Sequence, residues 1–175
     1  MIICVDTSGS MIGEPEQVAK TIAFALAQKS LEEERPCYLI TFSDTGDKCE
    51  TLDLSSYLTT DGISNLVEFL KKSFHGGTDP EPALKGGIKL MNDNKWSRAD
   101  LLMISDFDME PLSPERERDI ESQKKKGSRF FSLKIGTCTK QDILKCFNEQ
   151  WEYTSASQDA VKTLAKNMVD MGRRK

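Results

Sequence analysis

Apolar positions along the chain form short continuous runs that are separated by segments with a helical repeat. Six runs have the character of β-strands, and they occupy residues 2–5, 37–42, 48–52, 99–105, 129–135 and 151–154. Apolar runs without polar alternation are typical of strands that are buried on both faces of a parallel sheet. The run at 48–52 is more polar and follows a tight turn, so we expect it to be an antiparallel strand at one edge.

The segments between these runs predict helices. Helical patterns cover residues 14–34, 61–74, 79–91, 113–126, 141–147 and 157–171. The clearest pattern places apolar residues at i, i+3, i+4, i+7 and i+11, which are Ile63, Leu66, Val67, Leu70 and Phe74. The segment 113–126 is very polar, with Ile120 as almost its only apolar residue, so we expect it to be loosely anchored.

Strands that alternate with helices predict a doubly wound, Rossmann-like α/β fold. We expect a mostly parallel six-stranded sheet with one antiparallel edge strand and helices on both faces. No repeat or linker divides the chain, so residues 1–175 are expected to form a single domain. Because a core strand begins at the second residue, we expect this domain to come from a longer protein.

Oxygen-bearing side chains follow two of the apolar strands and also occur in a glycine loop between them. Asp6, Ser8 and Ser10 come directly after the strand at 2–5, and Asp106 follows the strand at 99–105. Thr78 follows the pair Gly76-Gly77. In doubly wound folds, ligands bind beyond the carboxyl ends of the strands, where the strand order reverses. Hard divalent cations select oxygen ligands, so these residues predict a metal site at that edge.

The amino-acid sequences of these three stretches resemble the metal-ion-dependent adhesion site of von Willebrand factor A domains. The matching stretches are Cys-Val-Asp-Thr-Ser-Gly-Ser-Met at 4–11, Phe-His-Gly-Gly-Thr-Asp at 74–79 and Ile-Ser-Asp-Phe at 104–107. Within that family the chain looks most like the group of ViaA and CoxE-like proteins, which act beside MoxR-type AAA+ ATPases. The order and spacing of the elements extend the resemblance over essentially the whole chain.

The resemblance implies a role for each residue of the predicted site. The hydroxyls of Ser8, Ser10 and Thr78 would bind Mg²⁺, Mn²⁺ or Ca²⁺ directly, and the carboxylates of Asp6 and Asp106 would act directly or through water. The remaining position would accept a Glu or Asp side chain from a protein partner, such as a MoxR-type ATPase or its client. Two aspartates roughly neutralise one divalent cation, which leaves it attractive to a further carboxylate.

The pattern departs from the family next to Asp106. Many members have Ser-Asp-Gly where this chain has Ser105-Asp106-Phe107-Asp108, so we expect a different rim at this side of the site. Asp79 fits two roles equally well, support for a metal-bound oxygen or an acidic residue at a helix N-terminus. His75, the only histidine, lacks a nucleophile in the surrounding pattern and is interpreted as a rim residue.

The main enzymatic alternative is a Mg²⁺-dependent phosphohydrolase of the haloacid-dehalogenase type. Such enzymes carry an Asp-x-Asp motif after the first strand, whereas this chain has Ser8 at the position of the second aspartate. No nucleotide-binding glycine motif and no Gly-x-Ser-x-Gly elbow occurs. We therefore expect a protein-interaction domain without catalysis of its own.

The composition of the chain argues against several other functions and cellular locations. The net charge of −4 and the lack of a basic stripe with interleaved aromatics argue against nucleic-acid binding. No run approaches the length of a membrane span. The five cysteines lack a CxxC pair, and Cys4 and Cys37 lie inside apolar runs, which indicates reduced thiols and a cytoplasmic location.

Overall fold

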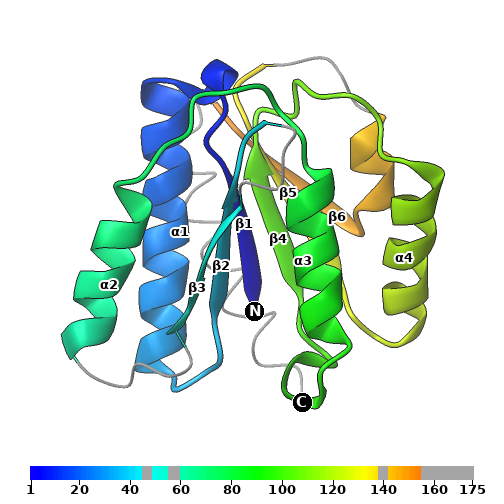
Figure 1. Cartoon of the computed structure of the whole chain (residues 1–175), viewed down its shortest axis with the longest axis horizontal. Coiled ribbons are helices and arrows are strands. Elements are labelled where there is room, and N and C mark those ends of the chain that lie inside the picture. The colour runs from blue at the N-terminus through cyan, green and yellow to red at the C-terminus, as the bar shows by residue number, and fades with distance from the viewer. Residues whose placement is uncertain (45–48, 55–59, 138–141, 155–175) are drawn as a thin grey trace.

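A computed structural model of the chain describes residues 1–44, 49–54, 60–137 and 142–154, and in this part six strands form one sheet. The strands are β1 Ile2–Asp6, β2 Tyr38–Phe42, β3 Glu50–Asp53, β4 Leu101–Ser105, β5 Phe130–Ile135 and β6 Glu149–Tyr153. Their order across the sheet is β3-β2-β1-β4-β5-β6 (Figure 1). β3 pairs with β2 in antiparallel orientation at one edge, and the other pairs are parallel. The predicted doubly wound sheet and its antiparallel edge strand are confirmed.

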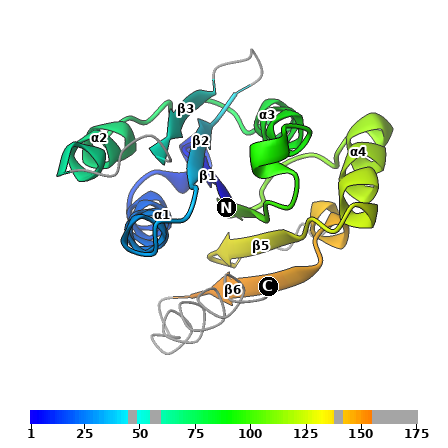
Figure 2. The ribbon, with the colours of Figure 1, turned by 90° about the horizontal axis from the view of Figure 1, so that it is seen from below.

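Helices cover both faces of the sheet. The α-helices are α1 Glu14–Glu32, α2 Thr60–Leu70, α3 Glu81–Met91 and α4 Pro114–Lys125, and short 3-10 turns are η1 Gly9–Met11, η3 Asn94–Trp96 and η4 Ile143–Cys146. α1 and α2 lie on one face and α3 and α4 on the other (Figure 2). η4 is a 3-10 turn where a longer helix is predicted. The predicted closing helix at 157–171 lies outside the described residues.

β1 forms the centre of the core because its side chains alternate between two apolar layers. Ile3 and Val5 pack with the layer under α1 and α2, whereas Ile2 and Cys4 pack with the layer under α3. Burying each such aliphatic side chain contributes about 1.5–3 kcal/mol. Gly87 lets α3 approach closely, since a Cβ there would lie 2.7 Å from Cδ1 of Leu101. The strand that leads to Asp6 is therefore rigidly held.

The two cysteines that lie in apolar runs are buried, as those runs predict. Cys4 and Cys37 are buried and carry free thiols. Burial raises the pKa of the Cys37 thiol to about 11 and also raises the pKa of Cys4. Both thiols are therefore protonated and unreactive at neutral pH.

The predicted apolar face of α2 is only partly correct. Leu66 and Leu70 are buried as expected, but Ile63 is 42% exposed and Val67 is 37% exposed. Phe69, which the pattern did not select, is buried. The helix lies at the outer side of α1, so the sheet does not cover its whole apolar stripe (Figure 2).

α4 is held by polar contacts, so the expectation of a loosely anchored helix is wrong. The backbone N–H of Ser113 donates to Glu81 Oε1 at 2.7 Å, and Arg116 Nε donates to Glu81 Oε2 at 3.2 Å. Gln123 Nε2 donates to Asn92 Oδ1 at 2.9 Å. Arg116 and Gln123 are buried together with Ile120, so polar side chains supply the contacts that apolar residues usually supply.

Candidate metal centre

The candidate site lies where the carboxyl ends of β1 and β4 meet. Val5 pairs with Ile104 in parallel register, which brings the next residues, Asp6 and Ser105, side by side. The chain runs from β1 to β2 on one side and from β4 to β5 on the other, so this is the point where the strand order reverses. The loops after both strands therefore open toward the same space.

Asp6 is a buried carboxylate that is held by hydrogen bonds. It is 0% exposed, its Oδ1 accepts the backbone N–H of Ser8 at 2.8 Å, and its Oδ2 accepts the Ser105 hydroxyl at 2.5 Å. Burial raises the pKa of Asp6 to about 6, although the hydrogen bonds from Ser105 and Ser8 lower it. The negative charge of Asp106 raises this pKa further, because a nearby carboxylate disfavours the ionised form of Asp6.

The loop after β1 brings two hydroxyls to the same place. Ser8 lies just before η1 in extended conformation, and its Oγ lies 3.2 Å from Oγ of Ser10. Ser8 is buried, whereas Ser10 is exposed. Alternate residues of this turn therefore present oxygen atoms in one cluster, with Ser10 facing solvent.

The loop that carries Thr78 is hydrogen-bonded to the loop after β1. The backbone N–H of His75 donates to the carbonyl of Thr7 at 2.9 Å, and the N–H of Gly9 donates to the carbonyl of Gly76 at 2.8 Å. Thr78 follows two residues later and is half-buried. The distant Gly-Gly-Thr stretch is thus brought to the edge where Asp6 ends its strand.

Ser43, directly after β2, holds the same loop from the other side. Its Oγ accepts the N–H of Gly76 at 3.0 Å and donates to the carbonyl of Gly77 at 3.0 Å. A Cβ at Gly76 would lie 2.9 Å from Cβ of Asp44, so only glycine permits this approach. The sequence did not single out Ser43, because its partners are more than thirty positions away.

Asp106 lies on the β4 side of the site and is half-buried. Its Oδ1 accepts the backbone N–H of Asp108 at 3.0 Å. Phe107 between them has φ of 60°, a conformation that favours glycine. Its ring is fully buried and contacts the ring of Phe147 edge to face, with centroids 5.9 Å apart. Packing of this ring accounts for a Phe at a position whose φ favours glycine.

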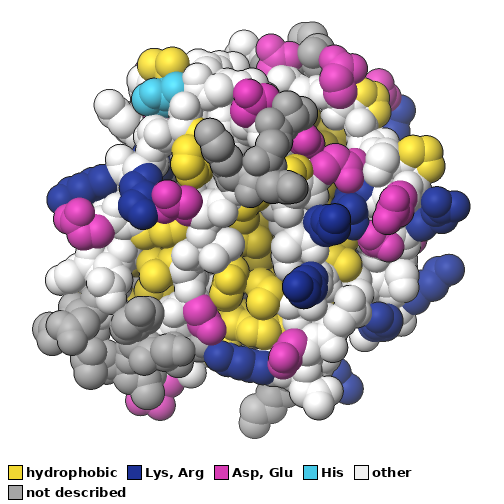
Figure 3. Space-filling model, in the orientation of Figure 1, with side chains coloured by type: hydrophobic (Ala, Val, Ile, Leu, Met, Phe, Trp, Pro, Cys, Tyr) yellow, Lys and Arg dark blue, Asp and Glu magenta, His cyan; other side chains and the backbone are white. Residues whose placement is uncertain are grey.

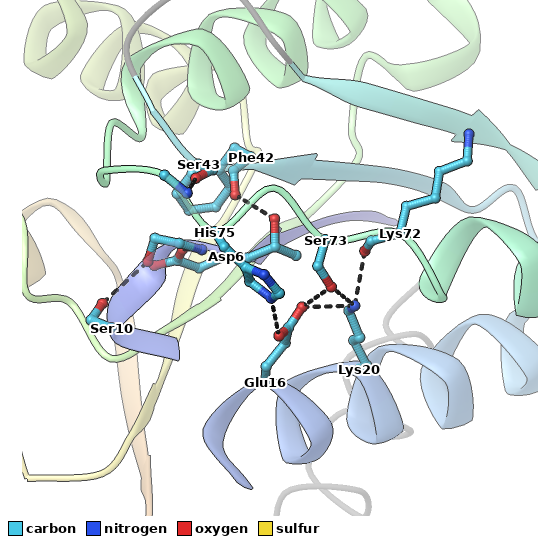
Figure 4. A network of polar contacts seen from close by, with 12 residues as sticks. Asp6, Ser10, Glu16, Lys20, Phe42, Ser43, Lys72, Ser73 and His75 are labelled. Carbon is cyan, nitrogen blue, oxygen red and sulfur yellow. Dashed lines mark hydrogen bonds and ion pairs between the residues drawn. The ribbon is translucent and has the colours of Figure 1, made fainter. Parts of the chain in front are cut away.

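A polar network around the buried carboxylate of Glu16 joins α1 to the loop that leads to Thr78 (Figure 4). Glu16 Oε1 forms an ion pair with Lys20 Nζ at 2.7 Å and accepts the Ser73 hydroxyl, and Glu16 Oε2 lies 3.1 Å from His75 Nε2. Lys20 Nζ also donates to the carbonyl of Lys72 at 2.8 Å. Burial raises the pKa of Glu16, but Lys20, Ser73 and His75 offset this and hold the pKa below its ordinary value.

Asp79 makes the contact expected of an acidic residue at a helix N-terminus, because its Oδ1 accepts the backbone N–H of Glu81, the first residue of α3, at 2.9 Å. Its other predicted role, support for a metal-bound oxygen, stays a prediction. His75 lies at the rim as expected, but sequence reasoning did not foresee its contact with Glu16. Sequence reasoning also missed Ser105, although its position next to Asp106 at the end of β4 was a usable signal.

The donor set of this edge fits a hard divalent cation. Asp6 is buried, and in the part of the chain that the structure describes it forms no ion pair with a basic side chain. Among the described residues, no three or more His, Cys, Asp or Glu side chains lie together in a way that could hold a metal ion. A cation here would therefore need hydroxyl oxygens in addition to carboxylates, and Ser8 and Ser10 offer them beside Asp6.

The fold and this edge define a doubly wound α/β domain with an oxygen-rich loop site. Residues 1–108 match the family model of the von Willebrand factor type A domain, and the chain belongs to this family. It is 36% identical over 156 residues to the regulatory protein ViaA of Edwardsiella ictaluri, and these residues make up 88% of this chain and 31% of that protein. It is 35% identical to the regulatory protein ViaA of Proteus mirabilis over 87% of this chain and 30% of that protein. The chain thus spans about a third of the length of these relatives.

Solved structures with low sequence identity share the fold. The conserved hypothetical protein BatB of Bacteroides thetaiotaomicron superposes with a TM-score of 0.70 at 16% identity, over 99% of this chain and 98% of that chain. The VWA domain of SpRpn10 superposes with a TM-score of 0.62 at 15% identity, over 94% of this chain and 93% of that chain. Among the described residues, no helix has the length and apolar character needed to span a membrane.

Proposed function

We propose that this domain is a divalent-metal-dependent protein-interaction module without catalytic activity. Ser8, Ser10 and Thr78, together with Asp6 and Asp106, would hold Mg²⁺, or alternatively Mn²⁺ or Ca²⁺. The observation that carries the proposal is the state of Asp6. It is a fully buried carboxylate next to hydroxyl oxygens, and no basic side chain among the described residues pairs with it. A buried charge of this kind needs a cationic partner.

The charge balance of the donor set supports a role in binding acidic partners. A bound hard cation would supply a positive centre at an edge that is open to solvent. Asp6 and Asp106 together balance the charge of one divalent cation, and the hydroxyls add no further negative charge. The exposed position of Ser10 leaves this side of the cluster accessible. A Glu or Asp side chain of a second protein is the ligand that such a site prefers.

The contacts of His75 argue for binding without catalysis. A serine nucleophile needs a base within hydrogen-bond reach, and His75 is the only histidine of the chain. Its Nε2 faces Glu16 Oε2 at 3.1 Å, and Ser8 Oγ instead contacts Ser10 Oγ at 3.2 Å. Among the described residues, Ser8 Oγ therefore contacts a second hydroxyl and not the histidine, which supports a role as a metal ligand over a role as a nucleophile.

The rim of the site offers an apolar contact for a partner. Ile12 is 58% exposed, and only one residue separates it from Ser10 in the sequence. The end of the molecule above the strands carries hydrophobic and histidine atoms on one side and acidic side chains on the other (Figure 3). We expect a partner segment in which an apolar side chain lies close to the acidic residue, because burial of Ile12 would add about 1.5–3 kcal/mol.

The partner that we propose is a MoxR-type AAA+ ATPase or its client. This rests on the similarity to regulatory proteins named ViaA and on the resemblance of the motifs to that group. The buried, protonated thiols of Cys4 and Cys37 agree with a cytoplasmic location.

The proposal is tested by binding of the purified chain to a purified MoxR-type ATPase from the same organism, in Mg²⁺ and in EDTA. We expect co-elution in Mg²⁺, loss in EDTA and recovery when excess Mg²⁺ is added back. Asp6→Ala should give the EDTA result in Mg²⁺. The chain can also be tested against a client protein in the same two buffers. If it binds the ATPase and the client equally well in Mg²⁺ and in EDTA, the contact does not depend on a metal.

A further inference from the structure

Glu16 is a buried carboxylate that is not among the predicted metal ligands. It lies in the first turn of α1, and only 7% of the residue is exposed. Two of its partners come from the loop between α2 and α3, because the Ser73 hydroxyl donates to Oε1 and His75 Nε2 lies 3.1 Å from Oε2 (Figure 4). Lys20 Nζ pairs with Oε1 at 2.7 Å. Glu16 therefore joins α1 to a loop that lies more than fifty positions away in the sequence.

The segments on either side of this connection are the two halves of the candidate metal centre. One half is residues 6–10, between β1 and α1, and the other half is the loop that carries Thr78. Two backbone hydrogen bonds between residues 7–9 and 75–76 already join the halves, at 2.9 and 2.8 Å. Glu16 adds a side-chain connection, from the helix that follows the first half to the loop of the second half.

His75 has an uncommon backbone conformation at the turn into the second half. Its φ is 53°, a left-handed value that residues with a side chain rarely adopt. Despite burial, which raises it, the partners of Glu16 hold its pKa below the ordinary value, so Glu16 is ionised near neutral pH. A carboxylate only accepts hydrogen bonds, so His75 Nε2 carries the hydrogen. A charge-assisted bond thus holds the side chain of the residue at which the loop turns.

We propose that the contact between Glu16 and His75 positions the Thr78 loop and thereby sets the cation affinity of the candidate metal centre. This inference rests on the proposed metal-binding function. Neither side chain would touch the cation. A site whose ligands come from two segments binds more tightly when both are already in place, because binding otherwise has to order the loop as well. Glu16 and His75 are therefore positioning residues.

The test compares two substitutions of His75, whose side chain is 46% exposed and can be changed without opening the core. His75→Gln keeps a side-chain N–H that can reach Glu16, whereas His75→Leu has no donor. Both variants carry a non-glycine residue at the same positive φ, so they share the backbone cost. We expect calorimetry on the full chain to show about tenfold weaker Mg²⁺ binding in His75→Leu, and recovery of most of this loss in His75→Gln. Gln17→Leu, at an exposed position of α1, is the control and should leave Mg²⁺ affinity unchanged.

A second measurement follows the loop without metal. The backbone N–H of Gly9 donates to the Gly76 carbonyl, so its hydrogen exchange, read by NMR, reports whether the two halves stay together. The Gly9 amide should exchange faster in His75→Leu than in His75→Gln, while the amides of β1 keep equal protection in both. Equal exchange of the Gly9 amide in the two variants would overturn the positioning role, and so would a loss of protection spread evenly over β1.

The two measurements also separate this inference from the proposed function. If the unchanged chain binds no Mg²⁺, the proposed function fails and this inference fails with it. If the unchanged chain binds Mg²⁺ and His75→Leu binds it equally tightly, this inference alone is overturned and the metal site stands.

Discussion

Ser105 at the end of β4 donates its hydroxyl hydrogen to Asp6 Oδ2 at the end of β1 at 2.5 Å, across 99 positions of sequence. The Ser105 hydroxyl also accepts the backbone N–H of Phe107 at 2.9 Å. One buried hydroxyl thus joins the carboxylate of the first loop to the backbone of the last loop of the candidate site. This contact holds the Asp6 carboxylate in one orientation without a bound ligand.

The first prediction concerns this contact. Ser105→Ala should lower the free energy of unfolding by about 1–3 kcal/mol, because Asp6 and the Phe107 amide each lose a buried partner. It should also weaken Mg²⁺ binding, since Asp6 is no longer held in place. Chemical denaturation and calorimetry measure the two effects. Thr21→Ala removes an exposed hydroxyl that bonds only within α1, to the Gln17 carbonyl at 2.7 Å, and should lower neither quantity.

The second prediction concerns the charge of the site. Asp6→Ala should abolish Mg²⁺ binding, because the cation loses half of the carboxylate charge that compensates it. The fold should survive, since Asp6 lies at the end of its strand and no basic side chain loses a partner. Isothermal calorimetry with circular dichroism checks both points, and Glu115→Ala, at an exposed position of α4, serves as the charge control. Unchanged Mg²⁺ affinity in Asp6→Ala would contradict the assignment of Asp6 and its neighbours as the metal site.

The third prediction concerns the apolar rim. Ile12→Asp should weaken partner binding by more than tenfold, because burial of this side chain is worth about 1.5–3 kcal/mol and a carboxylate would repel an acidic ligand. Mg²⁺ affinity itself should stay nearly the same. Ile63→Asp on α2 is the matched control, since Ile63 is 42% exposed and belongs to another surface. Equal losses of partner binding in both variants would mean that Ile12 has no special role.

The fourth prediction is a pH dependence that arises from Glu16. Its pKa is lowered in the folded chain, so its ionised form contributes stability above its unfolded pKa of about 4.3. This contribution is lost as the pH falls through the lower folded value. The difference in unfolding free energy between the unchanged chain and Glu16→Gln should therefore be constant near neutrality and shrink below about pH 4.3. Urea melts at several pH values measure it, and a difference that grows on acidification would contradict the network in Figure 4.

The fifth prediction weighs strain against packing at Phe107. Glycine would relieve the positive φ, which costs a non-glycine residue about 1–2 kcal/mol. Loss of the buried ring against Phe147 costs about 3–5 kcal/mol, so packing should win. Phe107→Gly is therefore expected to destabilise the chain by roughly 1–4 kcal/mol in thermal or urea melts. A stabilised variant would mean that strain at this position exceeds the packing term.

The sequence by itself determined the strands, the class of fold and the antiparallel edge. Apolar runs such as 2–5 and 99–105 report burial directly, because a strand between two helical layers has no polar face. The sequence also predicted which loops would meet, since parallel strands bring Asp6 and Asp106 to one edge. The assignment of these residues as metal ligands stays a prediction.

Only the tertiary structure decided which side chains support those loops. The contacts of Ser105 with Asp6, of Ser43 with Gly76 and of Glu16 with His75 each join segments that lie more than thirty positions apart. No local period encodes such contacts. The same limit explains α2 and α4, where neighbouring elements determined that Val67 remains exposed and that Arg116 is buried. A periodic pattern fixes which side of a helix is apolar, whereas packing decides how much of that side is covered.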